Sequence, residues 1–161
     1  MAVTSRIWTV AVVGCGIGRA HIEGYRSHSD KFRVAALCDV DERRLEAIGD
    51  EFRIARRTQS FDELLRMENV EIIDICTPPA LHVSQIIAAL AAGKDVVCEK
   101  PLSGSLADVD QVMLAEQEAA GRVRRPNGSS IWASLENRIW SPSKRPGSAR
   151  QNITRRPGAG D

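Results

Sequence analysis

The feature that most constrains the fold of this chain is a regular alternation of short apolar runs with longer amphipathic segments over residues 6–123. The runs are continuous and rich in β-branched residues, as expected of strands buried on both faces of a parallel sheet. Right-handed crossovers then favour a doubly wound α/β fold with strand order 3-2-1-4-5. Strands are expected at 7–13, 32–38, 54–57, 72–76 and 96–98, and helices at 16–28, 41–52, 60–67, 79–92 and 105–120.

The composition changes after residue 123. Residues 1–123 carry 14 Lys and Arg against 19 Asp and Glu, a net charge of −5, whereas residues 124–161 carry 8 against 2, a net charge of +6. Gly, Pro and Ser supply 14 of the last 38 residues. Such a segment cannot bury enough apolar surface to offset the entropy of ordering. We expect one domain over residues 6–123, a largely disordered basic tail over 124–161, and no evident continuation into a sixth strand near residue 123.

A glycine-rich loop follows the first strand directly and opens the first helix. Gly14 suits a tight turn, and Gly16 lets the backbone approach a pyrophosphate. The N–H groups and positive dipole end of the helix then favour an anion at this point. The spacing departs from G-x-G-x-x-G, because Arg19 holds the third glycine position and Gly18 comes one residue early. The loop predicts dinucleotide binding, with a purely structural turn as the alternative.

Asp39 ends the second strand, 25 residues after Gly14. A carboxylate near this spacing can accept hydrogen bonds from adenosine ribose hydroxyls and repels a 2′-phosphate, which favours NAD over NADP. Arg43 and Arg44 lie close by in sequence and leave NADP open. Asp39 could instead initiate the following helix, although Asp41 suits that role better.

Polar residues follow the next two strands, at the sheet edge that faces the ligand crevice of open α/β folds. Lys100, after the fifth strand, could exchange a proton with a substrate oxygen, and Glu99 could pair with it or contact the cofactor. After the fourth strand, Thr77 and Pro78 precede a helix whose first turn carries His82. The spacing leaves two possibilities for His82, a crevice residue or a surface histidine. His21 is expected to pack near the glycine loop.

Cysteine usage and hydropathy indicate the cellular compartment in which the chain is expected. Cys15, Cys38, Cys76 and Cys98 show no C-x-x-C or zinc-site spacing, and each lies at or near the end of an apolar run, which predicts reduced, buried thiols. No signal peptide is evident, and no apolar run approaches the roughly 20 residues of a membrane helix. We expect a cytoplasmic protein with no membrane partner.

The segments VAVVGCGIGRAH, ALCDVD, DICTPPALH and AAGKDVVCEKPL together resemble the Gfo/Idh/MocA family of oxidoreductases, which includes glucose–fructose oxidoreductases and inositol dehydrogenases. The resemblance implies a Rossmann domain that binds NAD(P), and hydride transfer between nicotinamide and a sugar or cyclic polyol. It also implies that Lys100 is the catalytic lysine. The cofactor-lining residues that it implies are Gly14, Gly16, Ile17, Asp39, Thr77, Pro78, His82, Glu99 and Lys100.

The resemblance extends over residues 6–123 alone. The family's remaining catalytic residues, typically an Asp and a His on one helix of a second domain, have no counterpart in residues 124–161, which contain no His and only Asp161. The chain therefore resembles the cofactor half, and we expect it to bind nucleotide without normal turnover. A frameshift is one hypothesis for the abrupt change in composition. Translation of the other frames tests it, and the hypothesis fails if neither frame continues a sixth strand.

Two other functions stay open at this point. The first is a non-catalytic dinucleotide-binding or sensing module, which would retain affinity for NAD without turnover. The second is association of the basic tail with nucleic acid, which should collapse as salt rises. Because basic tails are usually only solvated, nucleic acid is not the expected partner.

Overall fold

The computed structural model of the chain describes residues 6–122, so the expectations for the tail and for a sixth strand lie outside the described residues. Within that range, five parallel strands form one sheet in the order β3-β2-β1-β4-β5, which confirms the predicted order. The strands are β1 (Trp8–Val13), β2 (Phe32–Cys38), β3 (Arg57–Thr58), β4 (Ile72–Ile75) and β5 (Asp95–Cys98). The helices are α1 (Cys15–Ser27), α2 (Glu42–Phe52), α3 (Phe61–Leu65), α4 (Pro79–Ala91) and α5 (Leu106–Arg122).

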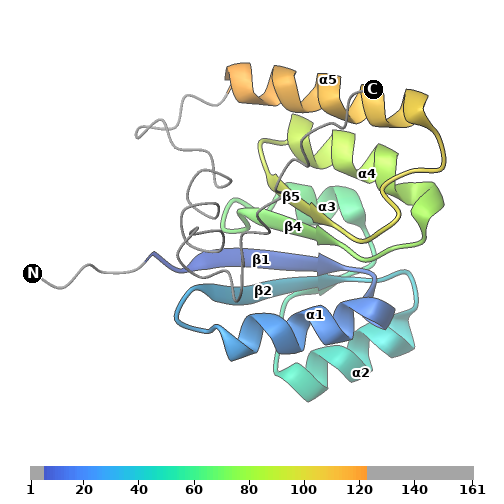
Figure 1. Cartoon of the computed structure of the whole chain (residues 1–161). Coiled ribbons are helices and arrows are strands. Elements are labelled where there is room, and N and C mark those ends of the chain that lie inside the picture. Colours follow the sequence, from blue (N-terminus) through green and yellow to red (C-terminus); the bar gives the residue numbers. More distant parts are fainter. Residues whose placement is uncertain (1–5, 123–161) are drawn as a thin grey trace, which may run out of the picture. The chain divides into compact units, whose positions relative to one another are not determined.

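Helices cover both faces of the sheet (Figure 1). The helices α1 and α2 lie on one face, α4 lies on the other, and α5 packs on the outer side of α4. Successive residues of β1 point to opposite faces, so that Ala11 and Val13 join the core beneath α3 and α4 while Val12 contacts α1. This is the doubly wound arrangement that continuous apolar strands predict.

Side-chain caps fix where the helices begin. The hydroxyl of Ser60 accepts from the N–H of Glu63 at 3.2 Å, and Asp41 and Ser105 cap α2 and α5 in the same way. Ser60 and Glu63 have the spacing of a capping box, of which only one half forms. The Glu63 carboxylate accepts from the Thr58 hydroxyl at 2.7 Å, and Thr58 Oγ1 in turn accepts from the N–H of Ser60 at 3.0 Å. The side chain of Thr58 therefore takes the place of the second arm of the box.

The third strand begins later than the sequence predicts, at Arg57 instead of Ile54. Arg53 ends α2 in the left-handed conformation, with φ +56°, and the N–H of Ile54 donates to the carbonyl of Gly49 at 2.8 Å. The N–H of Ile54 therefore bonds to the end of the helix instead of to the sheet, and the Ile54 side chain is buried in the core. The chain reaches the sheet edge only at Arg57, and β3 is two residues long.

Candidate functional site

The glycine loop joins β1 to the first turn of α1. Gly14 has φ +89°, and a Cβ there would lie 2.6 Å from the carbonyl oxygen of Cys76, so that only glycine fits. At Gly16, in contrast, a Cβ would meet nothing nearer than Nη1 of Arg44 at 3.9 Å. The loop therefore packs tightly against the chain that leaves β4 and keeps its backbone open at Gly16.

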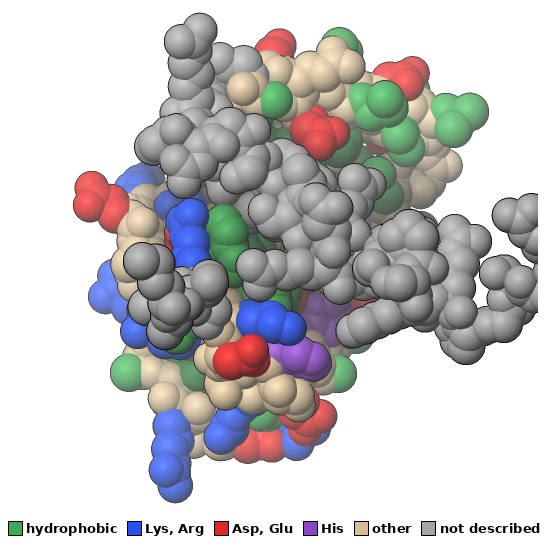
Figure 2. Space-filling model, turned by 60° about the vertical axis from the view of Figure 1, so that its left-hand side comes forward, with side chains coloured by type: hydrophobic (Ala, Val, Ile, Leu, Met, Phe, Trp, Pro, Cys, Tyr) green, Lys and Arg blue, Asp and Glu red, His purple; other side chains and the backbone are tan. Residues whose placement is uncertain are grey.

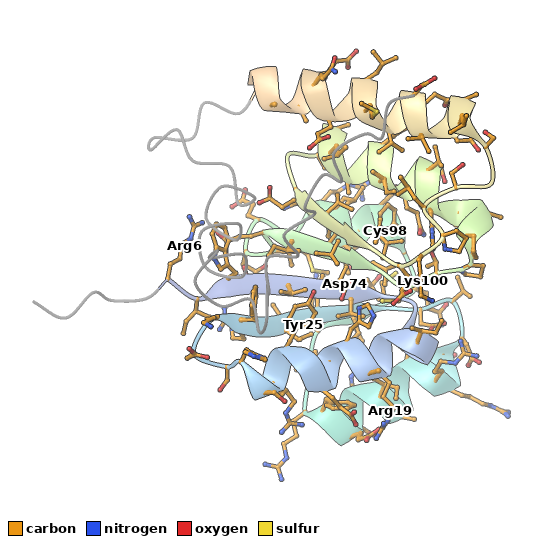
Figure 3. The ribbon with its side chains drawn as sticks, viewed as in Figure 1. Arg6, Arg19, Tyr25, Asp74, Cys98 and Lys100 are labelled. Atoms are coloured by element: carbon orange, nitrogen blue, oxygen red, sulfur yellow. The ribbon has the colours of Figure 1, made fainter. Side chains whose placement is uncertain are left out.

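The third glycine of the pattern has moved by one residue. A Cβ on Gly18 would lie 2.6 Å from Cγ1 of Val12 in β1, so Gly18 provides the close approach of helix to sheet that this pattern requires. Arg19 points away from the sheet, where it pairs with Glu23 and Glu51 (Figure 3). The early glycine thus keeps α1 close to the sheet and leaves the loop able to accept a phosphate.

The first turn of α1 suits an anion. It contains no acidic residue, and its first backbone N–H groups lack carbonyl partners within the helix, that of Cys15 donating instead to Asp39. Ile17, in this turn, is 60% exposed. The chain therefore presents a positive helix end with an accessible backbone beside Gly16.

Asp39 lies beside the loop and is almost fully buried. Its Oδ2 accepts from the N–H of Cys15 at 2.7 Å, and its Oδ1 accepts from the N–H of Asp41 at 2.9 Å. Arg44 approaches the same carboxylate, with Nη1 3.4 Å from Oδ2, and also pairs with Asp41 at 3.3 Å. Asp39 therefore fixes the glycine loop against the end of β2, and the Arg44 guanidinium lies beside its carboxylate.

The loop after β4 is tied to the loop after β5 through His82. Its side chain is fully buried, with Nε2 2.7 Å from the carbonyl of Thr77 and Nδ1 2.9 Å from the carbonyl of Pro101. The alternative that His82 is a surface histidine is wrong. Pro78 precedes α4, the Lys100–Pro101 peptide bond is cis, and the hydroxyl of Thr77 donates to Gln85 at 2.6 Å. The His82 ring thus joins the two loops that flank the predicted catalytic edge.

The strand β5 ends at Cys98, and the next two residues carry the charges of the edge. The N–H of Glu99 donates to the carbonyl of Ile75 at 2.9 Å, which continues the pairing of β4 with β5. One carboxylate oxygen of Glu99 accepts from the N–H of Lys100 at 3.0 Å. This hydrogen bond, followed by one from His21, holds the pKa of the Glu99 carboxyl below its usual range. The Lys100 side chain is exposed at the end of the strand (Figure 3).

A polar cluster lies between α1 and the sheet. Asp74, in β4, is fully buried, and its Oδ2 lies 2.9 Å from Nδ1 of His21. Nε2 of His21 lies 3.0 Å from Oε1 of Glu99. Burial lowers the pKa of His21, but its hydrogen bonds to the two carboxylates outweigh burial and raise the pKa above its ordinary value. Burial, and then the Asp74 charge, raise the pKa of Tyr25, whose hydroxyl bonds to Asp74.

Three atoms of this cluster are of the kind that bind metals. His21, Asp74 and Cys76 each offer one ligand atom, and these atoms lie within 4.8 Å of one another. Cys76 Sγ lies 3.4 Å from His21 Nδ1 and donates to Asp74 Oδ1 at 3.6 Å. Hydrogen bonds among these groups account for their proximity.

The four cysteines are free thiols. Burial is the main cause that raises the pKa of Cys15 to about 12 and those of Cys38 and Cys98 to about 11, and it also raises the pKa of Cys76. Thiols with such pKa values stay protonated at neutral pH and are poor nucleophiles. The prediction of buried thiols holds for Cys15, Cys38 and Cys76, whereas Cys98 is only partly buried.

The fold and the loop define an α/β domain of the dinucleotide-binding class. The open cradle at Gly16, the helix N-terminus and the adjacent Asp39 carboxylate fit an NAD pyrophosphate and ribose. Residues 8–125 match the family described as "Oxidoreductase family, NAD-binding Rossmann fold", and the chain belongs to this Gfo/Idh/MocA family. The resemblance, the fold class and the NAD cofactor that the sequence predicts are confirmed.

Named relatives are dehydrogenases. The chain is 37% identical over 112 residues to D-apiose dehydrogenase of Paraburkholderia graminis, which covers 69% of this chain and 29% of that protein. It is 33% identical over 111 residues to myo-inositol 2-dehydrogenase of Thermotoga maritima, covering 68% and 33%. The chain thus spans about a third of the length of the curated relatives it matches.

Solved structures share the fold. The WlbA dehydrogenase from Bordetella pertussis, in complex with NADH and UDP-GlcNAcA, superposes with a TM-score of 0.68 at 30% identity, over 73% of this chain and 34% of that chain. GenD2 from gentamicin A biosynthesis, in complex with NAD, gives 0.67 at 30% identity, over 73% and 34%. Among residues 6–122, no helix is long and apolar enough to cross a membrane.

Sequence reasoning missed part of the site. Asp74 and Tyr25 were not singled out, although an aspartate within the apolar run 72–76 is a signal that could have found the first. Tyr25 gives no such signal, because its role depends on the position of β4. His21, expected near the glycine loop, lies against Asp74 and Cys76 and also reaches Glu99 beyond the end of β5.

Proposed function

We propose that residues 6–123 are the NAD-binding domain of a dehydrogenase that acts on a sugar or cyclic polyol. The observation that carries the proposal is that the glycine loop, Asp39 and the Glu99–Lys100 turn meet at the carboxyl edge of one parallel sheet. Open α/β sheets bind their ligands at this edge. The D-apiose and myo-inositol dehydrogenases among the relatives support the substrate class.

The proposed cofactor contacts follow the edge from one end to the other. Gly14, Gly16 and Ile17 receive the pyrophosphate, and Asp39 receives the adenosine ribose. The nicotinamide half lies against the loops after β4 and β5. Its proposed neighbours there are Thr77, Pro78, His82, Glu99 and Lys100. Because His82 is fully buried, it contributes by holding these loops together.

Lys100 is the proposed catalytic residue. Bound NAD supplies the hydride acceptor, so the chain needs a group that takes the hydroxyl proton of the substrate. The Nζ of Lys100 is exposed at the edge where substrate would meet nicotinamide. Glu99 accepts from the Lys100 backbone N–H and so fixes the direction in which this side chain leaves the strand.

The first experiment is titration of the full chain with NADH and then NADPH, following nicotinamide fluorescence and melting temperature together. Saturable NADH binding is expected, with a stabilisation of about 2.7 kcal/mol at a concentration of one hundred times Kd. Absence of binding by the folded protein would overturn the proposed function.

The same titration tests whether Asp39, and not Arg44, determines the preference of the site for NADH over NADPH. Asp39→Asn keeps an acceptor for the N–H of Cys15 but removes the negative charge that repels a 2′-phosphate. The ratio of the NADPH to the NADH dissociation constant should therefore fall in this variant. Asp62→Asn, an exposed change in α3, is the matched control and should leave the ratio unchanged. An unchanged ratio in Asp39→Asn would show that this carboxylate only holds the loop.

Lys100 is tested in a chimera that joins residues 1–122 to the remaining part of the Thermotoga maritima relative. With an active chimera as reference, Lys100→Met should lower kcat by about 10²- to 10⁴-fold, the usual contribution of general acid–base catalysis. The dissociation constant of NADH should change far less than kcat, since the backbone of the turn is retained. If the Lys100→Met chimera kept full turnover, Lys100 would have no catalytic role.

The remaining functional alternatives receive less support. A non-catalytic sensing module is disfavoured because the named relatives are dehydrogenases. Basic and acidic side chains are interspersed on the face drawn in Figure 2, and the basic residues 124–161 lie outside the described part of the chain, so association with nucleic acid stays a prediction. We propose the cytoplasm as the compartment, which the four free thiols support.

A further inference from the structure

We propose that His21 is a positioning residue whose ring, oriented by the buried Asp74, holds the carboxylate of Glu99 and thereby sets the turn that presents Lys100. The proposal rests on the proposed function of that turn in binding cofactor and transferring a proton. It assigns to α1 a second task besides binding phosphate.

An unbroken series of hydrogen bonds carries the inference. Asp74 Oδ2 lies 2.9 Å from Nδ1 of His21, whose Nε2 lies 3.0 Å from Oε1 of Glu99. The other oxygen of Glu99 accepts from the N–H of Lys100 at 3.0 Å. The series runs from the middle of β4, across α1, to the backbone at the end of β5. Movement of the ring would therefore move the Glu99 carboxylate and the peptide that follows it.

The two carboxylates determine which protonation state of the His21 ring can bind both of them. Ionised carboxylates only accept hydrogen bonds, so each of Asp74 and Glu99 needs an N–H from the imidazole. Only the protonated ring has two. Neutral His21 has one N–H and can keep only one of the two carboxylates, and Asp74 is fully buried, where water cannot replace a lost donor. Loss of the proton would therefore release Glu99, which is closer to solvent.

The surroundings do not supply a competing cation at Asp74. Within residues 6–122, the other titratable groups that act on the cluster are a phenol, two thiols and an ammonium: Tyr25 on α1, Cys76 after β4, Cys98 on β5 and Lys100 after it. The phenol and thiols are kept neutral by burial, which raises their pKa values. Lys100 acts on Glu99 from the solvent side. His21 is thus the group that links the two carboxylates.

Nuclear magnetic resonance of the full chain tests the linkage directly. Because both carboxylates raise the pKa of His21, its two ring nitrogens should stay protonated above the ordinary midpoint of about pH 6.5. The N–H shift of Lys100 should change with the same midpoint, and Asp74→Asn should lower that midpoint. A neutral ring at pH 6.5, or a Lys100 N–H that does not follow the ring, would overturn the proposal.

Binding of NADH tests the consequence for the site. His21→Gln should weaken NADH binding about tenfold, the scale of one lost charge-assisted hydrogen bond, while His28→Gln, on the exposed end of the same helix, should change it less than twofold. Wild-type affinity should fall as pH rises through the His21 midpoint, and that fall should be absent in His21→Gln. Equal affinity of folded His21→Gln and wild type would contradict the positioning role.

The two measurements separate this inference from the proposed function. If the wild-type chain binds no NADH, the proposed function fails, and the shared midpoint of His21 and the Lys100 N–H still decides whether the ring sets the turn. If His21→Gln does not fold, Asp74→Asn provides the second variant, because it keeps the shape of the cluster. It should lower the His21 midpoint and weaken NADH binding at pH 7, and tight binding by that variant would overturn the proposal.

Discussion

Asp74 is a carboxylate within a four-residue strand whose other members are isoleucines. It is fully buried, and an ionised carboxylate without donors would be strongly destabilising in that position. His21 and Cys76 hydrogen bond to it directly. The polar residue is compatible with the core because His21 and Tyr25 of α1, together with Cys76 after β4, bring hydrogen-bonding groups to it, which makes the docking of this helix specific in both position and rotation.

Gly18 makes that docking possible and offers a stability test. Gly18→Ala would place a Cβ 2.6 Å from Cγ1 of Val12, and overpacking of this kind costs about 1–3 kcal/mol. The free energy of unfolding, measured by urea denaturation, should fall by that amount.

Gly24 provides the matched control on the same helix. A Cβ at Gly24 would meet no atom within 4 Å, so Gly24→Ala should stabilise the protein by about 0.5–1 kcal/mol through the higher helix propensity of alanine. If both substitutions stabilised the protein, that result would contradict the close approach of α1 to β1 at Gly18.

At the scale of elements, α1 connects the two halves of the site. Its first turn lies at the open glycine loop, and one of its faces carries Gly18, His21 and Tyr25 toward β1 and β4. These residues are spaced three and four apart, which places them on one side of a helix. A shift of α1 along the sheet would therefore disturb phosphate binding and the Glu99 contact together.

The limits of sequence prediction are also clearest at this scale. Apolar periodicity predicted α2, and the expected span 79–92 matches α4, each to within one residue at either end. The third strand begins later than predicted, because the N–H of Ile54 bonds to the end of α2. The capping box formed only in part, because Thr58, which lies in β3, bound Glu63. Both departures come from contacts between elements, which local pattern does not contain.

At the scale of the whole molecule, side-chain ties join the strands at both ends of the sheet. At the end away from the cofactor edge, Glu71 accepts from the N–H and the hydroxyl of Thr9, each at 3.1 Å, and pairs with Arg6. Burial raises the pKa of Glu71, but these donors outweigh it and hold the pKa below its usual range. The ionised carboxylate is therefore the form that stabilises the fold.

The contact of Glu71 with Thr9 and Arg6 predicts part of the stability that the protein loses at acid pH. A carboxyl group with a lowered pKa in the folded state stabilises the protein above its unfolded value of about 4.3, and the contribution is lost as pH falls through the folded pKa. Glu71→Gln should lower the free energy of unfolding by about 1 kcal/mol at pH 7, and the difference from wild type should shrink below pH 4.3.

Glu116→Gln is the control for this measurement, because Glu116 is exposed on α5, away from the contact of Glu71 with Thr9. Its unfolding free energy should follow that of the wild type at every pH. A Glu71→Gln difference that persists at pH 3 would instead mean that the side chain stabilises by packing.

The sequence alone determined the class of fold, the order of the strands, the glycine loop and the polar residues at the carboxyl edge. These depend on periodicity and on positions relative to strand ends, which are local properties of the chain. Only the tertiary structure decided which of those residues meet. Gly18 replaced the expected third glycine because of its distance to Val12, and His82 is buried because two loops converge on it. His21 joins Asp74 to Glu99 across 53 and 78 positions of sequence, a separation that no local pattern can bridge.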